Sequence, residues 1–354
     1  MTINHNFFLN LAFQLAEKNL GQTEKNPSVG SIVVKNNTVI SSGLTSVTGR
    51  PHAEFNALDK IKNTKGSTLY TTLEPCAHQG KTSPCTNIII KKKIKKVYYA
   101  FEDPDKRTYK KAKKILLKKG IIAKLIRSKK YKNFYKSYFI NKKFNIPFIS
   151  AKIAISKDFF TINKKDKWIT NIFSRKIAHL IRSRHDGLLS TSKSINYDNS
   201  LLNCRINGLD NYKPALFIID LNLKLKKNLL LNKILKKRIT YLITYKSNIK
   251  KAQIYKKKGY KIILITSLKN KIDFIFLFKK LYKMGYSRVL VESGLSFFNT
   301  LIKNRLINEL YIFKSNKKLR KNGKNNTTLK YLKNIQAKQI SINLNNDKLY
   351  KKEF

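Results

Sequence analysis

The chain has 354 residues, 42% of them hydrophobic, and a formal net charge of +56. This length corresponds to about two domains of roughly 100–200 residues each, and the hydrophobic content excludes a wholly disordered protein. No uncharged apolar run approaches the length of a membrane span, and the N-terminal segment lacks the layout of a signal peptide. We therefore expect a soluble, cytoplasmic protein with no membrane partner.

The first half of the chain alternates helical and extended patterns, which predicts a three-layer α/β/α domain. The elements expected there, in chain order, are a helix over Asn4–Leu20, strands Val29–Lys35 and Thr38–Gly43 around an Asn36-Asn37 turn, helix His52–Ile61, strand Ser67–Thr71, helix Pro84–Lys92, strand Val97–Phe101, a lysine-rich helix that ends at Gly120, and strand Ile121–Ile126. The weakly apolar segment Tyr131–Asn145 then leads to Pro147, where we place a domain boundary.

The second half begins with a new apolar strand and repeats the alternation. The elements expected there are strand Phe148–Ile155, helix Asn171–Ser183, strands Gly187–Ser190, Leu216–Asp220 and Thr240–Thr244, helix Lys250–Lys258, strand Lys261–Ile265, helix Phe274–Met284, strand Val289–Val291, helix Phe297–Lys303, and closing strands Ile307–Phe313 and Gln339–Asn345. This is a second α/β unit of about 200 residues. The chain is thus expected to contain domains 1–146 and 147–354.

The positive charge comes from lysines that are spread over the whole chain. Lysine runs occur in both halves, for example at 91–93 and 256–258, and no basic block is set apart as a tail. Lys, Asn and Ile share A/T-rich codons, so a biased genome explains the charge without a nucleic-acid partner. A surface selected to bind a polyanion is the alternative. We expect no specific nucleic-acid partner, but salt-sensitive binding to polyanions in vitro.

The strongest chemical signal is a set of residue types that zinc prefers, in the order His, Cys, Cys. His52 and Glu54 lie in a Pro-His-Ala-Glu sequence, and Cys76 and Cys85 each follow a proline. A catalytic zinc site takes three protein ligands and keeps a fourth position for water, and His52, Cys76 and Cys85 supply three. Glu54 is placed to take the proton of this water and to pass it to a ring nitrogen and then to a leaving amine.

This arrangement resembles the zinc-dependent deaminases of the cytidine deaminase superfamily. It departs from them in one respect, because eight residues separate the cysteines instead of two, and this insertion contains His78 and Lys81. A structural zinc site with His78 as fourth ligand is the alternative. Cys204 has no such neighbours, and we expect it to be an inert packing residue.

Three segments resemble one family more closely, the bifunctional deaminase/reductase of riboflavin biosynthesis. They are Asn26–Gly30, Pro51–Glu54 and Thr72–Cys85, the last with the long insertion typical of that family. The resemblance implies zinc-hydroxide hydrolytic deamination of 2,5-diamino-6-(5-phosphoribosylamino)pyrimidin-4-one. It also implies that the base, ribose or phosphate contacts Asn26, His78, Lys81 and Asp103. Beyond Asp103 the sequence departs from the family, since Asp105–Tyr109 replaces an Asn-Pro and a glycine-containing loop.

The second half resembles the reductase domain of the same family, which has a dihydrofolate-reductase-like α/β fold and uses NADPH. The matching stretches are 147–152, 156–158, 168–170, 217–220 and 291–294. The resemblance implies reduction of the ribosyl group to ribityl by hydride delivery to C1′. It places NADPH against Ala154, Trp168, Ser194, Asp198, Gly294, Leu295, Ser296, Phe297, Phe298 and Asn299. It places the substrate against Lys152, Asp166, Arg182, Leu202, Arg205 and Glu292.

An expected helix start and three departures from the family bear on the second half. Backbone N–H groups around 292–296, at the start of an expected helix, would suit a pyrophosphate. The reduction that the resemblance implies makes Lys152 and Glu292 candidates for handling a proton or orienting the sugar. The departures from the family are Phe159 in place of a glycine, Asp198-Asn199-Ser200 in place of Asp-Asp-Pro, and Lys314–Lys324 in place of a glycine-rich turn.

The sequence is compatible with three functions. The first is the bifunctional enzyme, which binds one Zn²⁺ and NADPH, acts on a small phosphorylated pyrimidine and is a candidate to form a homo-oligomer; a variant of it has a degenerate reductase half. The second is an RNA or tRNA base deaminase with a basic nucleic-acid-binding C-terminal domain, which predicts a short Cys-x-x-Cys spacing. The third is a nucleic-acid-binding protein with a structural zinc. The long insertion and Glu54 favour the bifunctional enzyme.

Overall fold

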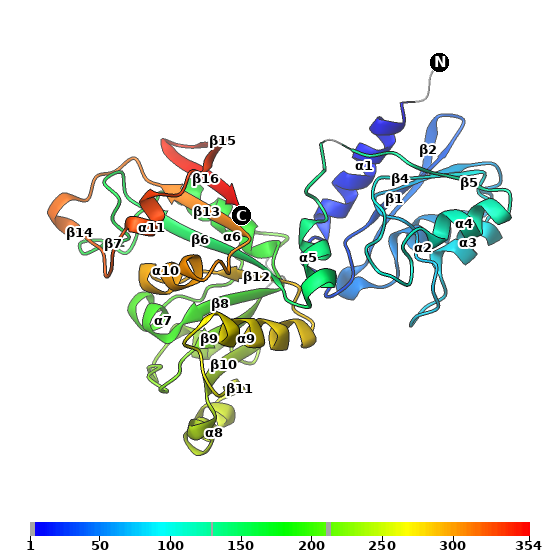
Figure 1. Cartoon of the computed structure of the whole chain (residues 1–354). Coiled ribbons are helices and arrows are strands. Elements are labelled where there is room, and N and C mark those ends of the chain that lie inside the picture. The colour runs from blue at the N-terminus through cyan, green and yellow to red at the C-terminus, as the bar shows by residue number, and fades with distance from the viewer. Residues whose placement is uncertain (1–3, 129, 210–213) are drawn as a thin grey trace. The chain divides into compact units, whose positions relative to one another are not determined.

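The computed structural model describes residues 4–128, 130–209 and 214–354. The chain forms two compact units, Met1–Asn145 and Ile146–Phe354 (Figure 1). None of the helices in the described ranges combines the length and the apolar content that crossing a membrane requires. Each unit has its own sheet and its own buried core.

In its described residues, the first unit contains a five-stranded sheet and five α-helices. The strands are β1 (Gly30–Lys35), β2 (Thr38–Leu44), β3 (Thr68–Thr71), β4 (Lys96–Tyr99) and β5 (Ile122–Leu125). The helices are α1 (His5–Lys18), α2 (Ala53–Leu58), α3 (Cys85–Lys91), α4 (Lys111–Lys118) and α5 (Lys136–Phe144). The strand order is β2-β1-β3-β4-β5, with β1 antiparallel to both its neighbours and β3, β4 and β5 parallel.

The alternation of side chains along these strands creates two buried faces. Ile32, Val34 and Tyr70 point to a core that α1 and α5 cover, whereas Val33 and Leu69 point to a core that α2, α3 and α4 cover. Figure 1 shows these two groups of helices on opposite sides of the sheet. The expected three-layer α/β/α arrangement is therefore confirmed.

Close packing requires a glycine at position 30. Gly30 begins β1 directly under α1, and a Cβ atom there would lie 1.9 Å from the backbone oxygen of Ala12. Helix α5 was not predicted, because its buried residues include the polar Ser137 and Asn141 beside Tyr138, which weakens the apolar periodicity.

The second unit contains a nine-stranded sheet and a two-stranded ribbon. The strands are β6 (Phe148–Ile155), β7 (Ile162–Asn163), β8 (Gly187–Thr191), β9 (Ala215–Ile219), β10 (Thr240–Tyr245), β11 (Lys261–Ile265), β12 (Arg288–Val291), β13 (Glu309–Lys314), β14 (Gly323–Lys324), β15 (Lys338–Leu344) and β16 (Asp347–Glu353). The helices are α6 (Ile172–Ser183), α7 (Ser192–Asp198), α8 (Ile249–Lys257), α9 (Lys271–Lys283), α10 (Leu295–Lys303) and α11 (Lys330–Lys333).

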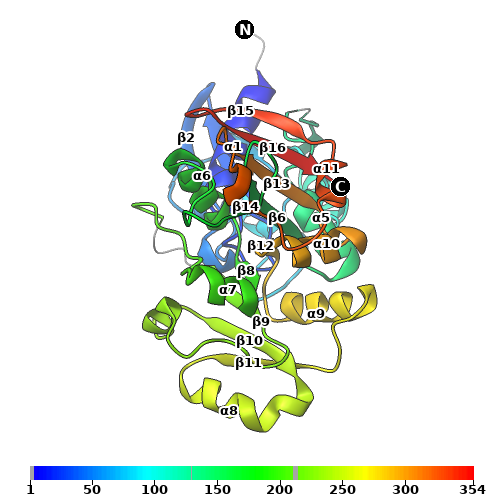
Figure 2. The same cartoon turned by 90° about the vertical axis from the view of Figure 1, so that its left-hand side faces the viewer.

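The order of the large sheet is β11-β10-β9-β8-β12-β6-β13-β16-β15, and its course from β8 to the β11 edge can be followed in Figure 2. All strands from β11 to β13 run parallel, and the β15–β16 hairpin closes the other edge antiparallel. Side chains of α9 and α10 pack on one face, and those of α7 and α8 pack on the other. The α/β class expected for this half is confirmed, while α7, α11, β16 and the β7–β14 ribbon were not predicted.

Candidate active sites

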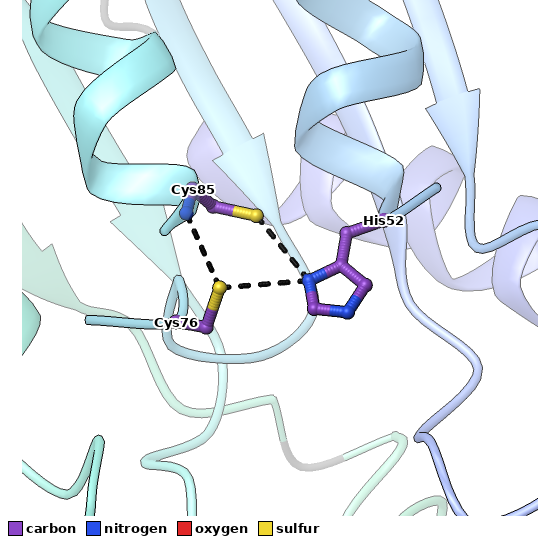
Figure 3. A group of neighbouring side chains, drawn as sticks. All are labelled: His52, Cys76 and Cys85. Carbon is purple, nitrogen blue, oxygen red and sulfur yellow. Dashed lines mark hydrogen bonds between the residues drawn. The ribbon is translucent and has the colours of Figure 1, made fainter. Parts of the chain in front are cut away.

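The three zinc-type residues of the first unit lie together at the starts of two helices. His52 is the residue before α2, Cys85 opens α3, and Cys76 lies in the loop after β3. Nδ1 of His52 lies 3.5 Å from Sγ of Cys76 and 3.4 Å from Sγ of Cys85 (Figure 3). The three ligand atoms all lie within 4.8 Å of one another.

These distances fit a zinc ion. With Zn–S of about 2.3 Å and Zn–N of about 2.05 Å, tetrahedral angles place a nitrogen and a sulfur ligand about 3.6 Å apart. The observed separations of 3.4 and 3.5 Å agree with this value. The backbone N–H of Cys85 donates to Sγ of Cys76 over 3.2 Å, and hydrogen bonding to the Cys85 and His52 groups lowers the pKa of the Cys76 thiol to about 4. Cys76 is thus prepared to bind a metal as a thiolate.

Glu54 lies beside this group but is not one of its ligands. It occupies the second position of α2, is only 3% exposed, and places Oε2 3.5 Å from Sγ of Cys85. Burial, together with the nearby Cys76 group, raises the pKa of Glu54 to about 7. A carboxyl group with such a pKa can both accept and release a proton near neutral pH.

The residues that the resemblance assigns to the deaminase substrate differ in how far they are exposed. The side chain of Asn26 abuts Gly49, just before the Pro51-His52 segment. Nδ1 of His78 lies 3.0 Å from Oγ1 of Thr108, while Lys81 is exposed on the insertion. The neighbouring Thr82 accepts a hydrogen bond from Arg50 over 2.5 Å, which ties the insertion to the segment before His52.

Asp103 is buried, and its environment includes partners that the sequence did not indicate. The Tyr138 hydroxyl, on α5, donates to Oδ1 of Asp103 over 3.1 Å, and burial raises the pKa of Asp103 to about 6. Glu74 accepts three backbone N–H groups, those of Asp103, Lys110 and Ala112, and so fixes the loop that departs from the family pattern. These contacts join residues at least 29 positions apart, so local spacing gave no sign of them.

A buried ion-pair group lies at the carboxyl end of β12 in the second unit. Arg182 donates to Oε1 and Oε2 of Glu292 through Nε and Nη2 over 2.5 and 2.9 Å. Nζ of Lys152 lies 3.0 Å from the second oxygen. Burial alone would raise the pKa of Glu292, but Arg182 and Lys152 outweigh it and hold that pKa well below its usual range. Glu292 is therefore a carboxylate with two cations in place.

A group of hydroxyls lies at the carboxyl ends of two neighbouring parallel strands, β8 and β12. Strands β8 and β12 are neighbours, yet the helices that follow them, α7 and α10, pack on opposite faces. Ligands of α/β sheets bind in such a crevice at the carboxyl ends of the strands. Ser194 lies there with its Oγ 3.1 Å from Thr191 Oγ1 and 3.2 Å from Ser293 Oγ, and it accepts the Gly294 N–H over 2.9 Å.

This group borders the N-terminus of α10, where backbone N–H groups favour an anion such as a pyrophosphate. Among the residues assigned to NADPH there, Gly294 and Ser296 are exposed, whereas the side chains of Leu295 and Phe298 pack in the core. The buried Asn299 donates to the carbonyl of Thr328 over 2.8 Å. Only part of the stretch 294–299 thus offers side chains to a ligand.

Four further assigned residues lie on β6, on α7 and in the segment between β7 and α6. Trp168 is 44% exposed and lies under the guanidinium of Arg175, 4.5 Å from the ring centre. Oδ1 of Asp166 accepts a hydrogen bond from the backbone N–H of Trp168, and Asp198 is an exposed residue at the end of α7. Ala154 lies on β6, near its end.

Phe159 occupies the position where the family has glycine, and its backbone keeps the conformation that favours glycine, with φ of 67°. Its ring lies against two lysines, with Nζ of Lys314 and Lys333 at 4.2 and 5.7 Å from the ring centre. Cation–π attraction of this kind contributes about 0.5–1 kcal/mol at exposed sites. The backbone of Phe159 thus has a left-handed conformation, and its ring is accommodated against the two lysines.

Comparison with protein families divides the chain in two. Residues 2–101 match the cytidine and deoxycytidylate deaminase zinc-binding region. Residues 147–332 match the RibD C-terminal domain.

Similar proteins cover nearly the whole chain. The riboflavin biosynthesis protein RibD of Buchnera aphidicola subsp. Baizongia pistaciae is 35% identical over 87% of this chain and 86% of its own length. RibD of Aquifex aeolicus is 32% identical over 86% and 85%. Among solved structures, Acinetobacter baumannii RibD has a TM-score of 0.83 at 24% identity, with 98% of each chain covered, which shows the same fold.

Proposed function

Since the chain belongs to the RibD family of riboflavin-biosynthesis proteins, we propose that its two units carry out consecutive steps on one pyrimidine substrate. The protein is a bifunctional enzyme, a zinc-dependent deaminase and an NADPH-dependent reductase. We assign the first step to residues 1–146 and the second to 147–354, with 2,5-diamino-6-(5-phosphoribosylamino)pyrimidin-4-one as substrate, and we place the reaction in the cytoplasm. The RNA-base-deaminase alternative is not favoured, because the second half matches a RibD domain.

In the first step the chain holds the metal and moves a proton. His52, Cys76 and Cys85 would hold zinc, which when bound supplies Lewis acidity that makes water a nucleophile near neutral pH. Glu54, buried beside Cys85, takes a proton from the nucleophile and delivers it to the amino group that leaves as ammonia. Asn26, His78, Lys81 and Asp103 orient the ring and the ribosyl phosphate.

In the second step the chain orients the sugar and the cofactor. NADPH, when bound, supplies a hydride. The hydroxyls of Ser194 and Ser293 and the N-terminus of α10 suit its phosphates. Lys152, held by Glu292, is placed to donate the proton that the ring oxygen needs when the ribosyl ring opens to ribityl.

The observation that carries this proposal is the coexistence of the two groups in one chain: the His52–Cys76–Cys85 group with Glu54 beside it, and the buried Lys152–Glu292–Arg182 group. The test is NADPH oxidation by the zinc-loaded protein given the diaminopyrimidinone ribosyl phosphate, at a salt concentration that suppresses binding to polyanions. Substrate-dependent oxidation that a zinc chelator abolishes is expected. Oxidation that persists without zinc would contradict the order of the two steps.

A further inference from the structure

The second unit contains a buried arginine whose hydrogen bonds go to backbone carbonyls. Arg238 is 4% exposed and follows the last turn before β10. Its Nε donates to the carbonyl of Pro214 over 2.7 Å, Nη1 to that of Leu201 over 2.5 Å, and Nη2 to that of Leu202 over 2.8 Å. One guanidinium thus joins three carbonyls from two separate segments of chain.

Two of these carbonyls belong to a buried loop, residues 201–205. Leu202, Asn203 and Cys204 are each less than 9% exposed, so their backbone polar groups need partners inside the protein. Leu202 also has φ of 51°, a left-handed conformation that a branched side chain rarely adopts and that its surroundings must maintain. Arg238 binds the carbonyls directly before and at this residue, and it therefore fixes the turn.

The other side of the loop is bound by the ion-pair group described above. The carbonyl of Asn203 accepts a hydrogen bond from Nη1 of Arg182 over 3.0 Å, and Arg182 is the partner of Glu292. The side-chain oxygen of Asn203 accepts a hydrogen bond from Nη1 of Arg205, also over 3.0 Å. Two arginines thus bind the backbone of the loop: Arg238 binds the carbonyls of Leu201 and Leu202, and Arg182 binds that of Asn203.

We propose that Arg238 is a positioning residue of the reductase, which holds the 201–205 loop so that Arg205 and Arg182 meet the substrate together. The proposal rests on the reductase function proposed above and on the resemblance, which places Arg182, Leu202 and Arg205 against the substrate. We assign Arg238 no contact with the substrate, because its side chain is buried and three of its N–H donors bind backbone carbonyls.

The charges around the loop support this role. Burial, and then repulsion from Arg182, lowers the pKa of Arg238 to about 9. Burial and Arg182 also lower the pKa of Arg205. Arg182 therefore repels both Arg238 and Arg205, and its own ion-pair partner is one carboxylate, Glu292. An anionic substrate would relieve this repulsion, provided that the loop keeps Arg205 in place.

The test compares Arg238→Met and Arg238→Lys with the unchanged chain. The deaminated intermediate is supplied directly, so that the first unit does not limit the rate. We expect Arg238→Met to raise the KM for this substrate at least tenfold, with the affinity for NADPH changed less than twofold. NADPH binding can be followed through Trp168, the single tryptophan of the chain, at the expected cofactor site. Arg238→Lys should give an intermediate KM, since an ammonium cannot reach all three carbonyls.

Arg288→Met is the matched control. Arg288 also donates from Nε to a backbone carbonyl, that of Arg184, over 3.0 Å, but it does not touch the loop. We expect its KM to stay unchanged. We expect faster hydrogen exchange of the 202–205 amides in Arg238→Lys, which would show directly that the loop is less ordered. This measurement can be made even where Arg238→Met fails to fold.

Two results would overturn the proposal. An unchanged substrate KM in both Arg238 variants would remove Arg238 from substrate positioning. If substrate affinity, NADPH affinity and the thermal midpoint all fell together, Arg238 would have a purely structural role. Absence of NADPH oxidation by the unchanged chain would instead contradict the reductase function itself, so the two failures are distinguishable.

Discussion

The ion pair between Glu292 and Arg182 allows a quantitative prediction of stability. Glu292→Gln keeps the size of the side chain but removes the charge that faces Arg182 at 2.5 and 2.9 Å and Lys152 at 3.0 Å. The side chains of Glu292 and Arg182 are 6% and 11% exposed, so little water can replace the lost charge. Removing one partner of a buried pair costs about 3–5 kcal/mol. Most of this belongs to Arg182, because Lys152 is 20% exposed and can turn toward solvent.

Calorimetry of the full chain measures this cost, since the two units can unfold in separate transitions. A domain of this size shifts by about 2–4 °C per kcal/mol, so the transition of the second unit should fall by roughly 6–20 °C while that of the first stays in place. The double variant Arg182→Met, Glu292→Gln no longer buries an unpaired guanidinium, and it should be at least as stable as Glu292→Gln alone. An unchanged transition in the single variant, or a further fall in the double one, would refute the argument.

Three other predictions concern the deaminase step, pH and packing. Glu54→Gln should retain one zinc per chain but lose about 10²–10⁴-fold in ammonia release, and normal turnover would remove Glu54 from proton transfer. Burial, then Arg288, lowers the pKa of His185 to about 3, so the folded state holds this ring neutral. The contribution of His185 to the free energy of unfolding is complete above pH 6.5 and is lost as the pH falls toward 3, by about 2 kcal/mol at pH 5. His185→Gln should therefore weaken the fall of the unfolding free energy between pH 6.5 and 5. An unchanged pH dependence would contradict this role of His185. Gly30→Ala should destabilise the first unit by about 1–3 kcal/mol or more, because its Cβ would meet a backbone oxygen at 1.9 Å. Gly80→Ala, where no atom lies closer than 3.8 Å, is the control, and equal effects would contradict the close approach.

The zinc residues could be found from the sequence because their chemistry is local and unusual. His52, Cys76 and Cys85 are rare residue types at the starts of predicted helices or after a predicted strand, and the structure brings their ligand atoms together. The groups that support the site could not be found in this way. Tyr138 reaches Asp103 across 35 residues, and nothing in a lysine-rich segment marks a tyrosine as its partner.

The strand β16 at the C-terminus was not predicted from the sequence. Asn345 and Asn346 form a two-residue turn with φ of 48° and 72°, much like Asn36 and Asn37, with φ of 48° and 62°. Apolar strands flank the earlier pair, and the hairpin was predicted there. The later pair leads into Asp347–Glu353, whose lysines leave no apolar alternation, although its Leu349 is buried against α6 and β13. The turn chemistry alone would have indicated the hairpin.

The second unit shows what sequence spacing cannot supply. Glu292, Arg182 and Lys152 come from three distant segments. The parallel pairing of β6 and β12 brings Lys152 to Glu292, and α6 supplies Arg182. Arg238 has no motif at all, because its role depends on three carbonyls that the fold delivers to it.

The central claim is that one chain carries two separate sites that act in sequence, and mixing two variants tests it most directly. We expect Glu54→Gln to lose the deaminase step and Glu292→Gln to lose the reductase step, so neither alone should oxidise NADPH when given the diaminopyrimidinone ribosyl phosphate. An equimolar mixture, kept below both unfolding transitions, should restore oxidation, because the deaminated product of one variant is the substrate of the other. A mixture that stays inactive, although each variant retains its remaining half-reaction, would contradict the account.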